Sequence, residues 1–468
     1  MSAWRAALLV LPVLLQLAVA ADSRAHGFGE RYDLPLPLWM YLTGAGLTVA
    51  LTFAFLAWQR RAPAGGEGAY SRVLLARVPG AAAAAMLLRL LVLALYLLVI
   101  WAGYAGLQSP SKNIAPAMVW AVWWVGMAYV SALIGDLWAL VNPLDTLFRA
   151  FERLWLRVAG TALRPVLAYP TWMKAWPAVL LFFLFVLLEL EWEGSEHPAS
   201  LATAMLLYSA LCWCAMALFG RGTWLRHGEV FAIVFGLLAR FAPNHWQDGQ
   251  WRLRPFAAGL LTRQPCDLSH IVLVMLMLAS VSFDGMMETQ PWLDLTGALP
   301  AWAMDWASVA ALVLLPAGFL LVFLGCCRLI VLCGGGGHAT FATAGLYVLT
   351  LVPISIAYHF AHYLSFLSMA VQYLIPLASD PLSLGWDLFG TRLYFIRLGI
   401  VDARLVWYVS LFAIVAAHVA AVCLAHIMAL RQFGNREAAL RSQYPMLALM
   451  VGYTLLSLWI IAQPIVSG

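Results

Sequence analysis

The sequence predicts an all-α protein that crosses a membrane about ten times after an N-terminal signal peptide. Of its 468 residues, 64% are hydrophobic and only 10% are charged, and no soluble core can bury so large an apolar fraction. The apolar residues also gather into runs of roughly 20, the length that an α-helix needs to cross a bilayer. The lipid bilayer is therefore a predicted partner. The net charge of +5 does not indicate nucleic-acid binding, because the basic residues sort by loop.

The first 25 residues are typical of a secretory signal peptide. Arg5 precedes an apolar run over 6–20, and small residues follow it. Cleavage is expected after Ala20 or after Ala25, and the first site lies closer to the apolar run. Cleavage after Ala25 makes His26 the new N-terminus, where its amine and its ring chelate one metal ion together. The remainder, 26–468, is predicted to be a single helical membrane domain.

Hydropathy places ten membrane-spanning helices in this domain. They are expected at 36–58, 82–105, 114–141, 174–192, 200–219, 267–284, 302–330, 340–375, 403–430 and 445–463. Two further segments do not fit a span. Residues 144–158 are amphipathic and are expected to lie flat on the membrane surface. The apolar stretch within 229–241 is too short to cross, which predicts a re-entrant or interfacial segment.

The loops predict the orientation of the chain. Nineteen of the 27 lysines and arginines fall in alternate loops, at 60–77, 149–174, 221–263, 328 and 431–441. The positive-inside rule assigns these loops to the cytoplasm, so both mature termini are expected outside. Most carboxylates gather on the outer side instead, among them Glu189, Asp284 and Asp380.

Two histidines lie inside one of the longest apolar runs. His359 and His362 are three positions apart, so they share one face of a membrane helix. Ionisable groups in hydrocarbon are costly and normally face the bundle interior or a wet cavity, where they mark function. One interpretation is therefore a site that handles metal ions or protons. The other is that each histidine only bonds a neighbouring helix.

Counting about 1.5 Å per residue predicts which residues reach the level of this pair. Above the cytoplasmic membrane edge, His359 stands roughly 29 Å high, Asp284 roughly 26 Å and His418 roughly 20 Å. These three, with His362 and the adjacent His26, supply nitrogen and oxygen ligands suited to a divalent metal, with zinc the first choice. A hydrolytic zinc needs three protein ligands and one open water position. A polar network that joins helices remains the alternative.

Four blocks in order carry a resemblance to a known family. The segments 26–39, 135–143, 358–365 and 378–381 resemble bacterial multi-pass membrane proteins known as fenitrothion hydrolases. The resemblance spans nearly the whole chain and carries over no catalytic residues. It implies a bacterial protein that hydrolyses an organophosphate triester. Together with the loop charges, it predicts the bacterial inner membrane as the location, with both mature termini periplasmic.

Two classes of function follow. The first is a metal-dependent hydrolase acting from the outer face on an apolar phosphotriester that partitions into lipid. Metal-bound water attacks phosphorus there, and Asp284 or Asp380 serves as ligand or base. The second is a transporter or a membrane partner subunit whose histidines relay protons or hold a transported ion.

Overall fold

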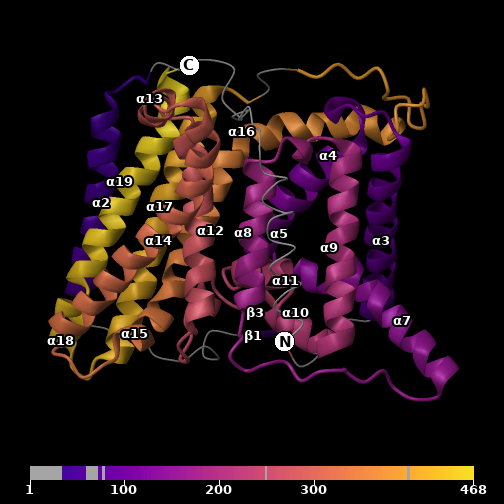
Figure 1. Ribbon diagram of the computed structural model, residues 1–468. Coiled ribbons are helices and arrows are strands. Elements are labelled where there is room, and N and C mark those ends of the chain that lie inside the picture. The colour runs from indigo at the N-terminus through magenta and orange to yellow at the C-terminus, as the bar shows by residue number, and fades with distance from the viewer. Residues whose placement is uncertain (1–33, 60–71, 76–79, 248–249, 398–400, 468) are drawn as a thin grey trace.

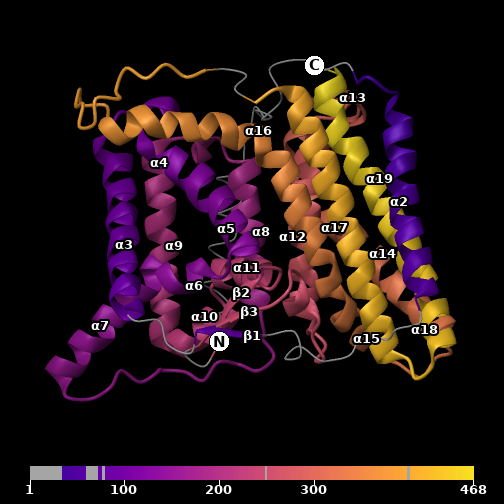
Figure 2. The ribbon, with the colours of Figure 1, turned by 180° about the vertical axis from the view of Figure 1, so that it is seen from behind.

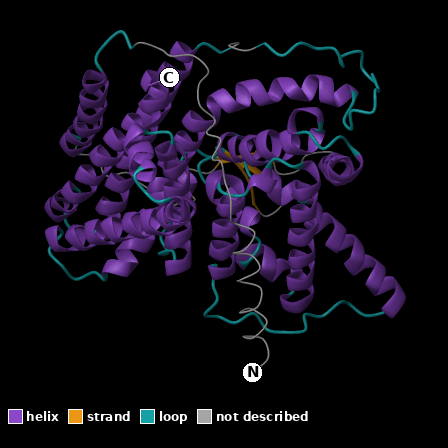
Figure 3. Ribbon diagram, turned by 45° about the horizontal axis from the view of Figure 1, so that its top comes forward, coloured by secondary structure: helices purple, strands orange, loops and turns teal. Residues whose placement is uncertain are grey.

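The computed structural model describes residues 34–59, 72–75, 80–247, 250–397 and 401–467, and most of these residues are helical (Figures 1 and 3). Nine of the helices in these residues are long and apolar enough to cross a membrane. The chain is therefore a multi-pass all-α membrane protein, as predicted. The predicted signal peptide and His26 lie outside the described residues.

The helices form two groups that stand side by side in Figures 1 and 2. The α3–α11 group consists of α3 (Ala81–Ala105), α4 (Ile114–Pro116), η3 (Ala117–Gly126), α5 (Met127–Leu133), α6 (Leu137–Val141), α7 (Pro143–Ala159), α8 (Trp176–Leu190), α9 (Pro198–Phe219), α10 (Arg221–His227) and α11 (Val230–Ala239). The α12–α19 group consists of α12 (Leu268–Met287), α13 (Gln290–Gly297), α14 (Ala301–Cys333), α15 (Thr340–Tyr347), α17 (Ala403–Gln432), α18 (Arg436–Ser442) and α19 (Tyr444–Ser467), together with the first described helix, α2 (Leu38–Trp58). Single 3-10 turns connect several of these: η2 (Pro110–Lys112), η4 (Glu193–Ser195), η5 (Ala258–Leu260) and η6 (Val348–Leu351).

One helix joins the two groups. α16 (Val352–Ser379) packs against α12 and α17 on one side and against η3, α5 and α11 on the other. Figures 1 and 2 show it running across the upper end of the α3–α11 group. At the seam between the groups, α12 packs against both α16 and α8. The Tyr363 hydroxyl of α16 also reaches Glu189 of α8.

Two predicted spans differ from the observed helices. The predicted span 114–141 breaks after Leu133, because Gly135 has φ 153° and the carboxylate of Asp136 caps the separate helix α6 by accepting from Ala139 N. The predicted span 174–192 is the 15-residue helix α8. Pro177 lies in its first turn and Glu191 at its C-terminal end, so polar and proline positions shorten it at both ends.

The segment predicted as re-entrant or interfacial contains α11, which lies inside the α3–α11 group. Eight of its ten residues are buried, so it is not on a surface. Its N-cap, Glu229, is fully buried and its carboxylate accepts five hydrogen bonds. The donors are Trp138 Nε1 (3.3 Å), Asn142 Nδ2 (3.2 Å), the Tyr208 hydroxyl (2.5 Å), Phe231 N (3.1 Å) and Ala232 N (2.7 Å). The sequence analysis did not single out Glu229, although an acid directly before a short apolar helix is an N-cap signal.

The lower end of the bundle in Figure 1 carries α7, α10, α18 and a small sheet, and the upper end carries α13. The sheet has the order β1-β3-β2 and is antiparallel, with β1 (Arg72–Leu75), β2 (Asn244–Gln247) and β3 (Gln250–Leu253).

α7 matches the predicted amphipathic segment 144–158. Its first apolar residues, Leu144 and Phe148, pack into the bundle, whereas Leu154 and Trp155 are exposed. The predicted basic loops thus meet at one end.

Candidate functional site

The candidate site lies at the seam between the two groups, where α8, α12 and α16 meet. α16 contributes His359, His362 and Tyr363, which fall on one face because of the helical period. α12 contributes Asp284 and α8 contributes Glu189. Glu189, predicted among the outer-side carboxylates, lies in the last turn of α8.

Four titratable side chains form a continuous hydrogen-bonded chain, which we call the polar cluster: His362, Asp284, Tyr363 and Glu189. His362 Nε2 lies 2.8 Å from Asp284 Oδ2. The Tyr363 hydroxyl lies 3.0 Å from Asp284 Oδ2 and 3.0 Å from Glu189 Oε1. The side chains of His362 and Asp284 are only 9% and 10% exposed. The predicted approach of Asp284 to the histidine pair is therefore present.

This arrangement is suited to holding and exchanging a proton. A hydroxyl has one hydrogen, so Tyr363 donates to only one of its two carboxylate neighbours at a time. Two ionised carboxylates on either side of it repel each other strongly in a poorly solvated interior. A proton on one carboxyl or on His362 relieves that repulsion, and the short contacts give it a path between the groups.

Gly285 allows the helices to approach at this point. A Cβ built at Gly285 would lie 2.8 Å from Ile460 Cγ2 of α19 and 2.9 Å from the Tyr358 hydroxyl. The same Cβ would lie 3.6 Å from His362 Nδ1. A side chain beside Asp284 would therefore displace α16 or α19, and the absence of one lets His362 reach Asp284.

His359 lies next to the polar cluster within a set of aromatic rings. Its ring centroid is 4.7 Å from that of Tyr363, 5.4 Å from that of Trp124 and 5.8 Å from that of Tyr129. Trp124 belongs to η3, a ten-residue π-helix, and π-helical segments are frequent at functional sites. His359 thus faces a different set of residues from His362.

His418 does not join the polar cluster. Its Nδ1 lies 2.8 Å from the carbonyl oxygen of Ile414 on its own helix, α17. On the same helix, the Ser410 hydroxyl lies 3.5 Å from the carbonyl oxygen of Ala361, the residue before His362 in α16. His418 follows Ser410 by eight residues, which places it about 12 Å further along the helix axis.

Asp380 is also separate from the polar cluster. It follows the last residue of α16, eighteen residues after His362, a distance of about 27 Å along a continuous helix. Its two carboxylate oxygens each accept a backbone hydrogen bond of 2.8 Å, one from Leu384 N and one from Gly385 N. Asp380 therefore holds the loop that follows α16, and its predicted role as a base or ligand stays a prediction.

Of the predicted zinc ligands that the structure describes, His362 and Asp284 come into contact. In the part of the chain that the structure describes, no group of three or more His, Cys, Asp or Glu side chains is placed to hold a metal ion. The physical reason is that His359 faces the aromatic rings and His418 lies about two helical turns from the level of the polar cluster. Only His362 and Asp284, among the described predicted ligands, are then left to share one ion. These residues do not fit a hydrolytic zinc site, and the predicted fifth ligand, His26, lies outside the described residues.

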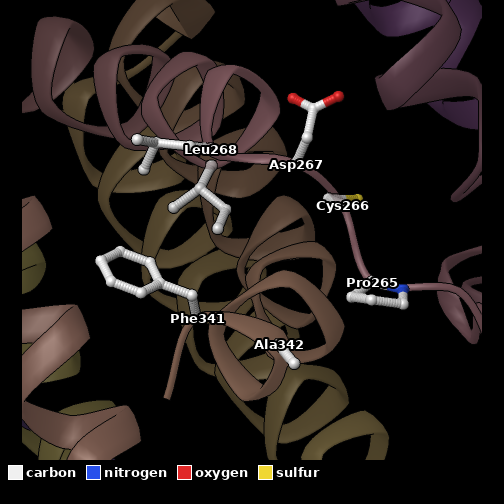
Figure 4. Close-up of a pocket in the computed structure, with 7 residues that line it drawn as sticks. Pro265, Cys266, Asp267, Leu268, Phe341 and Ala342 are labelled. Atoms are coloured by element: carbon white, nitrogen blue, oxygen red, sulfur yellow. The ribbon is translucent and has the colours of Figure 1, made fainter. Parts of the chain in front are cut away.

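A pocket of about 460 Å³ lies away from the polar cluster, at the start of α12 and beside α15 (Figure 4). Apolar side chains make up most of its lining, and the Asp267 carboxylate points away from Phe341 and Ala342. Burial disfavours the ionised form of Asp267, but hydrogen bonds from Ser269 and His270 outweigh this and lower its pKa. This carboxylate caps α12 by accepting from His270 N, which is a structural role.

Comparisons with protein-family models, curated proteins and solved structures found no match for this chain.

Proposed function

We propose that this multi-pass membrane protein takes up and releases protons at the polar cluster, as a transporter or as a membrane subunit of a larger assembly. The observation that carries the proposal is the unbroken chain from His362 through Asp284 and Tyr363 to Glu189, with contacts of 2.8, 3.0 and 3.0 Å. Titratable groups inside an apolar bundle are costly and mark proton or ion paths. Here they join helices of both groups.

The hydrolase that the resemblance implies has less support. A triester of drug-like size needs a cleft of roughly 300 Å³ or more, whereas the hollow beside His359 measures about 30 Å³. The His362–Asp284 pair has the geometry of a histidine base oriented by a carboxylate. Organophosphate hydrolysis therefore stays a prediction, to be tested by turnover of a chromogenic triester.

We further propose that the protein lies in the bacterial inner membrane with its upper end in the periplasm. The support is the gathering of basic segments at the lower end, near α7, α10, α18 and the sheet. α2 begins and α19 ends at the upper end (Figure 1), which agrees with periplasmic termini.

Infrared difference spectroscopy of the purified protein tests the proton proposal directly. Acidification of the sample is expected to produce a protonated-carboxyl band that disappears in Asp284→Asn or shifts in Glu189→Gln. His270→Gln is the matched control, because His270 pairs with Asp267 at 3.0 Å at the lower end of the same helix, outside the polar cluster. Its spectrum should retain the band.

Two outcomes separate the possibilities. A carboxyl band that survives both Asp284→Asn and Glu189→Gln in folded protein overturns the proposal. Where the band behaves as expected, proton flux into proteoliposomes driven by a potassium diffusion potential distinguishes a conducting protein from a subunit that needs its partners.

A further inference from the structure

A small cavity is lined by His359, whose ring neighbours Tyr363 of the polar cluster. Its volume is about 30 Å³ and its lining residues come from η3, α5, α8, α11, α12 and α16. Most of its lining is apolar or aromatic, including Trp124, Phe182 and Met277. Two polar side chains of α16 also line it, Ser355 and His359. These are four residues apart and so lie one above the other on the same helix face.

Both polar side chains lack a partner where they meet the cavity. His359 is 8% exposed and Ser355 is 5% exposed. His359 Nε2 and Ser355 Oγ are buried and have no hydrogen-bond partner among the described residues. Burying a donor or acceptor without a partner costs about 1–3 kcal/mol, so two such atoms at one cavity point to a missing partner.

The cavity has room for that partner. A water molecule needs about 10–15 Å³ of such volume and two to four polar neighbours. The cavity therefore accommodates one or two water molecules and excludes any larger ligand. Water also suits either tautomer of His359, since it donates to a bare Nε2 and accepts from a protonated one.

We propose that one or two water molecules are bound in this cavity between Ser355 Oγ and His359 Nε2. This is a hydration site deeper in the membrane than the polar cluster, by one helical turn from His362 to His359 and a second turn to Ser355. Exchange of protons between this water and the polar cluster rests on the proposed function above. The presence of the water does not.

Hydroxyl-radical footprinting of the intact protein by X-ray radiolysis tests the site, because bound water generates radicals that oxidise adjacent side chains. Met277 lines the cavity, whereas Met275 on the same helix is not among its lining residues. The two are buried to a similar degree, with 6% and 1% exposure. Met277 is expected to be oxidised severalfold faster than Met275.

Filling the cavity separates bound water from residual exposure. Ala128 is 4% exposed and lines the cavity, so Ala128→Val is expected to lower Met277 oxidation to the rate of Met275. Ser355→Val, which also removes the hydroxyl, serves if the first variant does not fold.

Equal and slow oxidation of Met277 and Met275 in the native protein would show a dry cavity and overturn the proposal. Faster Met277 oxidation that persists in a folded cavity-filling variant overturns it as well. Both results are read without any proton measurement, so failure here is distinct from failure of the infrared test.

Discussion

Glu229 and Asp284 are both carboxylates buried in an apolar bundle, but they differ in the kind of groups that surround them. Glu229, in the α3–α11 group, accepts five hydrogen bonds, two of them from the first backbone amides of α11. Asp284, at the seam, shares the Tyr363 hydroxyl with a second carboxylate, Glu189. The ring of His362 also lies within hydrogen-bonding distance of Asp284, at 2.8 Å.

Under the proposed function, this difference separates a carboxylate with a structural role, Glu229, from one that exchanges a proton, Asp284. Five donors and the positive end of a helix dipole stabilise the ionised form of a carboxylate and leave its lone pairs occupied. Where two carboxylates share one hydroxyl donor, protonation of one of them removes the repulsion between their charges. Burial of an acid in a membrane protein is thus not by itself a sign of proton transfer, and the informative feature is a second carboxylate that shares the same donor.

The largest expected effect is on stability at Glu229. Glu229→Gln keeps the shape of the side chain but turns an amide NH2 toward donors such as Trp138 and Asn142. We expect a loss of about 3 kcal/mol or more, since breaking a buried charged network by one partner costs about 3–5 kcal/mol. Thermal unfolding in detergent, followed by tryptophan fluorescence, measures it. A shift no larger than that of a surface substitution would contradict the structural role.

Gly285→Ala is expected to have the next largest effect, and it acts on the polar cluster. The new Cβ meets Ile460 and Tyr358 at less than 3.0 Å, and overpacking of this kind costs about 1–3 kcal/mol. The infrared carboxyl band should change together with the unfolding temperature. Gly318→Ala in α14 is the matched control, because nothing lies within 4 Å of its added Cβ. An unchanged band in Gly285→Ala would break the link between helix approach and the cluster.

Asp284→Asn should change stability by less than about 1 kcal/mol, well below the isosteric change at Glu229. The amide oxygen still accepts from Tyr363, and the substitution removes one of two mutually repelling carboxylates. The same unfolding measurement checks the ratio of the two effects. Equal losses of stability in Asp284→Asn and Glu229→Gln would contradict the difference proposed between the two sites.

The smallest effect is expected at Asp267, because it is a half-buried carboxylate with a lowered pKa. A pKa below its unfolded value means that its stabilisation is present above the unfolded pKa and is lost as the pH falls through the folded one. Asp267→Asn should therefore lower stability at neutral pH by less than about 1 kcal/mol, discounted for exposure. The difference from the native protein should vanish in acid. Unfolding temperatures across a pH series measure this, and a pH-independent difference would contradict it.

Much of the fold follows from local sequence signals. Long apolar runs predict helices such as α3 and α17 to within a few residues, because crossing a bilayer requires only local length and hydropathy. The three-stranded sheet was not predicted, since its short strands come from segments about 170 residues apart and carry polar residues. The break before α6 was missed because the Asp136 cap lies inside an otherwise apolar run.

The polar cluster was predictable only in part. His359, His362 and Asp284 are ionisable residues within or at the end of apolar runs, which is a signal that needs no structure. Tyr363 and Glu189 were missed as partners, because only the packing of α8 against α12 brings Glu189 to the hydroxyl. The predicted role of Asp380 depended on a loop path, and local backbone hydrogen bonds decide that path instead.

The position of α16 across both helix groups has a thermodynamic consequence. The contact between Tyr363 and Glu189 joins α16 to α8, so a rotation of one group against the other changes the separation of these two side chains. By linkage, a proton bound at the cluster and the angle between the groups share one coupling free energy, which acts equally in both directions. A ligand that fixes the angle would then shift the proton affinity, and acidification would shift the affinity for that ligand by the same factor.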